Sequence, residues 1–201
     1  MRYFKLLTAI LLVALPAGVQ AQDSDNATSE SAGADTTPVK KLANATDALL
    51  DGLSDKQLRQ YRAIRSAHGL IRSIENVRGT IDRAVKACRD NNPDMADSLE
   101  TRFVKWKRKI RPHLNAAKDK RDDMVVLQGF AEPKQVRKHL ELFDSAVAYK
   151  EDRFRKEPVS DAESCREMMA TMKSTQTRLI KLLKERLTLY DQLQGKGNNG
   201  E

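Results

Sequence analysis

Three histidines are the first candidates for chemistry, because imidazole nitrogens bind metal ions and exchange protons near neutral pH. His68, His113 and His139 fall on three separate predicted helices. A rise of about 1.5 Å per residue places them at similar heights. Only His113 lies on a predicted apolar face, so we expect three partly exposed histidines and no bound metal. Convergence of the three rings on a metal ion is the alternative.

Sulfur chemistry is suggested by three methionines, Met168, Met169 and Met172. Met168 and Met172 are four residues apart, a spacing shared by core residues and metal ligands. Met172 and His68 lie too far apart along the predicted bundle to ligate one haem iron, and the chain has no Cys-x-x-Cys-His motif. We therefore predict that the methionines pack in the core and that no cofactor is bound.

The two cysteines, Cys88 and Cys165, predict a structural cross-link. In an up-down-up-down bundle both fall about one helical turn from the same end, on the apolar faces of their helices. Cysteines placed in this way in an exported protein are usually joined. We predict the disulfide, with two buried free thiols as the alternative.

A dense basic run is the sharpest local feature. Trp106 and Ile110 face the predicted core, and the cations around them predict a surface for docking an anionic partner. An ordinary solvated helix face is the alternative, since acidic residues flank the run. The predicted binding residues are Lys105, Lys107, Arg108, Lys109, Arg111, Lys118, Lys120 and Arg121.

Catalytic signatures are missing from the sequence. It contains no nucleophile elbow, glycine-rich phosphate loop or zinc-protease helix. Its acidic residues are scattered beside basic ones, as on ordinary charged helix faces. We therefore expect a protein that is not an enzyme.

The elements that position these residues are helices, because apolar residues recur three and four positions apart and nowhere alternate. The pattern predicts an all-α fold, an antiparallel up-down-up-down four-helix bundle with a short extra N-terminal helix. Pro112 is expected to kink the second long helix without ending it. Capping boxes are predicted at Ser54 and Ser160. The predicted helices are 38–51, 53–91, 93–124, 132–157 and 160–194.

The predicted apolar faces define the expected core. They are Ile64, Ala67, Ile71, Ile74, Ile81, Val85 and Cys88 on the first long helix and Leu99, Phe103, Trp106 and Ile110 on the second. The third contributes Val136, Leu140, Phe143, Val147 and Phe154. The fourth contributes Cys165, Met168, Met172, Leu179, Leu182, Leu189 and Leu193.

The N-terminus predicts export. Residues 1–21 combine a positive start, an apolar run and a small residue at Ala21, as in a cleaved signal peptide. Residues 22–37 predict a disordered acidic leader, 38–195 the helical bundle domain and 196–201 a flexible tail. We expect a periplasmic or secreted protein, cleaved near Ala21 and with no membrane span in the mature chain.

The net charge is +8. Residues 22–51 are acidic, so the basic character belongs to the later helices. Envelope proteins, anionic lipid head groups or acidic polysaccharides are the expected partners, and nucleic acid is not.

Two short segments carry a resemblance. Leu53-Ser-Asp-Lys-Gln57 resembles the Leu-Thr-x-x-Gln motif of small, helical, basic envelope-stress chaperones, and Ala131-Glu-Pro-Lys-Gln135 is a looser echo. The match covers about five residues, and the family's usual second copy near the C-terminus is missing. Because a capping box gives the same letters through local hydrogen bonds, we assign no membership. The resemblance implies a protein that holds exposed polypeptide.

These observations predict an exported helical binding or structural protein of the cell envelope. It is expected to dock an anionic partner through the basic helix face. The alternative is a chaperone-like or stress-related protein, and metal binding is a third class. The sequence leaves the oligomeric state open.

Overall fold

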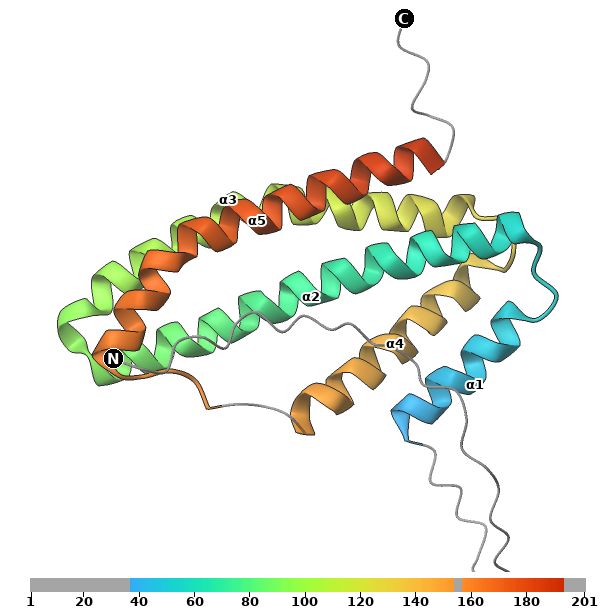
Figure 1. Cartoon of the computed structure of the whole chain (residues 1–201). Helices are drawn as coiled ribbons and strands as arrows, with labels where there is room; N and C mark the ends of the chain where they lie inside the picture. The colour runs from blue at the N-terminus through green and yellow to red at the C-terminus, as the bar shows by residue number, and fades with distance from the viewer. Residues whose placement is uncertain (1–36, 154–156, 194–201) are drawn as a thin grey trace, which may run out of the picture. The chain divides into compact units, whose positions relative to one another are not determined.

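The computed structural model describes residues 37–153 and 157–193, with side-chain surroundings up to Arg186. Within these ranges the regular elements are all helical, with no strand, and the predicted all-α class is confirmed. The predicted signal peptide, residues 22–36 of the leader and the tail lie outside the described residues. The elements are α1 (Pro38–Leu50), α2 (Asp55–Asn91), a 3-10 turn (Pro93–Met95), α3 (Ala96–Leu127), α4 (Pro133–Arg153) and α5 (Ala162–Leu193) (Figure 1).

Local hydrogen bonds explain where α1 and α2 begin. The Thr37 hydroxyl accepts from the Lys40 N–H at 3.3 Å, with Pro38 at the first position of α1. Ser54 and Gln57 form the predicted capping box at the start of α2. Gly52, in the turn between them, has φ of 70°, a left-handed conformation that glycine adopts without strain.

The larger core lies between α2, α3 and α5. Ile74, Trp106 and Leu183, one from each helix, are at most 2 % exposed. The predicted disulfide is present: Cys88 and Cys165 are bonded, with their Cα atoms 5.8 Å apart. It joins the end of α2 to the start of α5. Both α3 and α5 therefore run away from this end, opposite to α2, as the predicted alternation requires (Figure 1).

A smaller core lies where α4 meets α2 and α3. The predicted extra helix α1 packs antiparallel against α4 and contains no buried residue. Helix α1 is the main neighbour of α4, and α4 contacts α2 and α3 over a shorter stretch. This second cluster is made of Ile64, Ala67, Met124, Val125, Val136 and Leu140.

The core residues of α5 differ from the prediction at one position. Leu183 is fully buried, whereas the predicted Leu182 is 43 % exposed. The reason is helical geometry: eleven residues complete about three turns, so Leu183 lies on the face of Met172 and Leu182 does not. The side chains of Leu189 and Leu193, and the whole of Phe154, lie outside the described residues.

Helix ends and interruptions differ in two further places. Helix α3 was predicted to end at Met124, but it continues to Leu127 because Val125 packs into the smaller core. The cap of α5 is Asp161, not Ser160: its Oδ1 accepts from the Ser164 N–H at 2.9 Å. This bond lowers the pKa of Asp161. Helix α3 is continuous through Pro112, as predicted.

Gln57 also holds the corner between α3 and α4. Its Oε1 accepts from the Ser54 N–H at 2.9 Å, and its Nε2 donates to the Gly129 carbonyl at 3.0 Å. Gln135 accepts in the same way from the Glu132 N–H, at 3.3 Å. Both glutamines of the two chaperone-like segments therefore have a local structural role here.

We expect Gln57→Ala to lower the free energy of unfolding by about 1 kcal/mol, because a cap and a tertiary hydrogen bond are lost together. Urea denaturation measures the difference. Lys56→Ala, an exposed neighbour, is the control and should change stability by less than about 0.5 kcal/mol. Equal effects of the two substitutions would show that the corner contact contributes nothing.

Candidate functional site

A solvent-open groove of about 970 Å³ runs between α3 and α5, which lie side by side (Figure 1). It spans the N-terminal half of each helix, next to the disulfide end. Five of its lining residues are cationic and one is acidic. From α3 the groove is lined by Asp97, Ser98, Thr101, Arg102, Lys105, Trp106 and Lys109, and from α5 by Arg166, Met169, Ala170, Met172, Lys173 and Gln176.

The cations of the groove divide into two kinds. Arg102 is already engaged, since its Nη1 donates to the Met169 carbonyl at 3.0 Å and ties α3 to α5. The other four are exposed. In the part of the chain that the structure describes they form no ion pair, so their charge is available to a ligand. These four, named here the groove cations, are Lys105, Lys109, Arg166 and Lys173.

The base of the groove is apolar. Trp106 and Met172 are each 2 % exposed, and Met169 is half-buried beside them. The Trp106 ring stacks on Phe103, with centroids 6.0 Å apart. Its indole nitrogen has no hydrogen-bond partner among the described residues. The groove therefore offers apolar contact at its base and positive charge along both walls.

The predicted basic run does not form one surface. Lys105 and Lys109 line the groove, while Arg108 and Arg111 are exposed beside it. Lys107 lies 4.1 Å from the centroid of the Phe103 ring, with its Nζ 4.0 Å from Asp82 of α2.

The C-terminal part of the run faces α2 instead. Lys118 forms an ion pair with Glu75 at 2.5 Å, and Lys120 is half-buried. Arg121 pairs with Asp122 at 2.8 Å and also reaches His68. Lys118 and Arg121 therefore connect α3 to α2.

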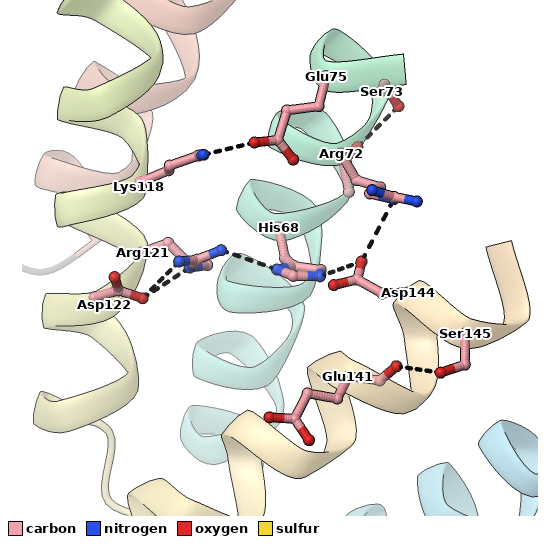
Figure 2. Close-up of polar contacts among 11 residues, drawn as sticks. His68, Arg72, Ser73, Glu75, Lys118, Arg121, Asp122, Glu141, Asp144 and Ser145 are labelled. Atoms are coloured by element: carbon pink, nitrogen blue, oxygen red, sulfur yellow. Dashed lines mark hydrogen bonds and ion pairs between the residues drawn. The ribbon is translucent and has the colours of Figure 1, made fainter. Parts of the chain in front are cut away.

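His68 is the centre of a polar network that joins α2, α3 and α4 (Figure 2). Arg121 Nη1 lies 3.2 Å from His68 Nδ1, and Asp144 Oδ1 lies 2.9 Å from His68 Nε2. Because a guanidinium group only donates, Nδ1 must accept, and the single ring proton is on Nε2, from which it donates to Asp144. Both nitrogens of a neutral ring are thereby satisfied.

His139 lies near this network on α4. Its Nε2 is 3.1 Å from the Tyr61 hydroxyl, and it is 4 % exposed. Its Nδ1 is buried without a hydrogen-bond partner among the described residues. The guanidinium of Arg65 lies 3.5 Å from the centroid of the Phe143 ring, which in turn packs edge-on against His68.

Burial lowers the pKa of both histidines, because a charged imidazolium loses its hydration there. For His68, the Asp144 carboxylate opposes this effect, and Arg121 and Arg65 add to it. For His139, Arg65 and His68 lower the pKa further. The site therefore favours neutral rings.

The predicted positions of the histidines are corrected by the structure. His68 and His139 are buried, whereas His113 is half-buried and Leu114 takes the inward position beside it. Helical spacing alone does not reveal this burial, because it depends on polar partners from other helices. Among the described residues, no three His, Cys, Asp or Glu side chains are grouped to hold a metal ion.

Met172 is in the core, as predicted, and Met168 packs against it. Met169 also packs against this core, and it lines the groove as well, where its sulfur accepts from the Ser98 hydroxyl at 3.8 Å. The contribution of α5 to the groove was missed altogether. A signal was present: Arg166 and Lys173 are seven residues apart, which places them on one face of a helix.

In comparisons with known proteins, no family model, no curated protein and no solved structure matches this chain. Among the residues that the structure describes, no helix is long and apolar enough to cross a membrane.

Proposed function

We propose that this protein is an exported binding protein of the cell envelope, and that an anionic partner docks in the groove between α3 and α5. The proposal rests on one observation: the four groove cations line the walls of a single groove that has an apolar base. A groove whose walls carry unpaired positive charge attracts anions and raises their association rate. The net charge of the full chain, +8, acts in the same direction, although Arg2 and Lys5 belong to the predicted signal peptide.

The export part of the proposal has two supports. Residues 1–21 have the pattern of a signal peptide, although they lie outside the described residues. The Cys88–Cys165 bond is of a kind that persists in oxidising compartments. We therefore propose a periplasmic or secreted location and a binding role without catalysis.

The proposed site is narrower than the basic run seen in the sequence. We exclude Lys118 and Arg121, because their charges are matched by Glu75 and Asp122. We retain Lys105 and Lys109 of that run and add Arg166 and Lys173 of α5, which the sequence analysis did not include.

Chemical cross-linking in intact cells tests the proposal with two matched variants. The groove variant, Lys109→Glu with Lys173→Glu, reverses one cation on each wall. The control variant, Arg111→Glu with Arg178→Glu, reverses one exposed cation on each of the same helices outside the groove. We expect a dominant cross-linked partner that disappears in the groove variant and persists in the control. A diffuse set of proteins, unchanged in both variants, would contradict this proposal and support the chaperone-like alternative.

A further inference from the structure

We infer that the segment docking in this groove is an amphipathic α-helix of a partner protein, with acidic residues on both sides of an apolar stripe. The inference rests on the proposed function and specifies the chemistry of the partner. It follows from three properties of the groove: its shape, its base and the arrangement of its charges.

The shape fits a helix. The α3 wall extends from Asp97 to Lys109, roughly 18 Å at the helical rise. This length corresponds to about three turns of a docked helix. The groove is open to solvent along its length, whereas small-molecule sites enclose most of their ligand. Two packed helices that present an open groove are suited to receive a third, as in other helix-in-groove complexes.

The base fits an apolar stripe. Met169 is half-buried and offers a flexible, polarisable side chain at this base, while Met172 and Trp106 are each 2 % exposed and close it. Methionine adapts to partner side chains of different shapes and is common at surfaces that bind amphipathic helices. Leucine-sized side chains on one face of a helix would fill this base.

The charges fit acidic flanks. Lys105 and Lys109 are four residues apart on the α3 wall, and Arg166 and Lys173 are seven apart on the α5 wall. These spacings correspond to about 6 Å and about 10 Å along a helix. A helix lying between the walls would match them with acids at i and i+4 on one flank and at i and i+7 on the other.

Other occupants fit less well. A second copy of the chain would bring a like-charged groove against this one. Residues 22–37 supply four acidic residues but no large apolar side chain for the base. The flat surface of a bilayer cannot follow a groove between two helices. A partner helix satisfies shape, base and charge together.

The fluorescence of Trp106 gives a local readout, because it is the only tryptophan in the chain. The oxidised mature protein is titrated with an 18-residue peptide that places leucines on one face and glutamates on both flanks, without aromatic residues. A scrambled peptide of the same composition, a peptide of residues 22–37 and phosphatidylglycerol vesicles are the comparison probes. We expect saturable binding of the amphipathic peptide, about tenfold weaker in the groove variant and within about twofold of wild type in the control variant.

The other outcomes are decisive as well. Equal affinity for the scrambled peptide would overturn the helix inference, because charge alone would then explain binding. Binding of vesicles or of the 22–37 peptide that is tighter than binding of the amphipathic peptide, and that is weakened in the groove variant, would also overturn the helix inference. The proposed function would then stand, because the ligand in the groove would still be anionic. If the groove variant binds all four probes as wild type does, both the inference and the proposed function are wrong.

Discussion

Replacing both cysteines, as Cys88→Ala with Cys165→Ala, is expected to lower the free energy of unfolding by about 4–5 kcal/mol. The two residues are 77 positions apart, so their bond removes much of the conformational freedom of the unfolded chain. It also fixes the start of α5, which carries two of the groove cations, against the end of α2.

Urea denaturation of the oxidised wild type and the double variant measures this difference. A reducing agent is the control: it should bring the wild type close to the variant and leave the variant unchanged. A difference below about 1 kcal/mol would mean that the packing of α2, α3 and α5 alone holds the start of α5 in place.

Stability is expected to decline as the pH falls from 7.5 to 5. Burial lowers the pKa of His68 and His139 in the folded protein from the ordinary value of 6.5. The unfolded chain therefore takes up protons first, and the stabilisation present above pH 6.5 is lost as the pH drops toward the folded pKa values. The loss is at most about 1.4 kcal/mol per pH unit for each histidine.

The groups around the histidines explain why protonation is unfavourable. A proton on His68 Nδ1 would face the Arg121 guanidinium, and among the described residues it is the Asp144 carboxylate that compensates for the added charge. His139 faces the uncharged Tyr61 hydroxyl. The remaining charged neighbours on α2, Arg65 and Arg72, are cationic.

Urea denaturation at several pH values tests this expectation with His68→Gln combined with His139→Gln. The double variant should be less stable than wild type at pH 7.5 but should show a flatter pH dependence. His113→Gln is the control, because His113 belongs to neither set of contacts, and it should keep the wild-type slope. A wild-type stability that does not change between pH 7.5 and 5 would contradict the assignment of two buried neutral rings.

Much of the fold could be predicted from the sequence because its determinants are local. Thr37, Ser54 and Gln57 cap helices within three residues of themselves, and three-four apolar spacing marks the inward face of each helix. The disulfide followed from topology, since the two cysteines fall at one end of an alternating bundle. The burial of Leu183 was not predicted, because Leu182 and Leu183 are adjacent and both fit three-four apolar spacing over a short stretch.

The candidate site was less predictable because it depends on which helices are neighbours. The cations between Lys105 and Arg121 are close together in the sequence. In the structure, some of them face α5, others face α2, and the rest face solvent. Lys105 and Lys109 become part of a site only when α5 brings Arg166 and Lys173 alongside. His68 likewise appears polar in the sequence, and its burial depends on Arg121 and Asp144 from two other helices.

The most direct test of the proposed groove is site-specific photocross-linking in cells of the source organism. A photoreactive amino acid replaces Thr101 or Gln176, one in each wall of the groove, or Lys86 on α2 as an outside position. We predict the same dominant adduct from both groove positions, none from Lys86, and loss of the adduct when Lys109→Glu and Lys173→Glu are added. Equal adducts from all three positions, or adducts unaffected by the charge reversal, would contradict the groove as the binding site.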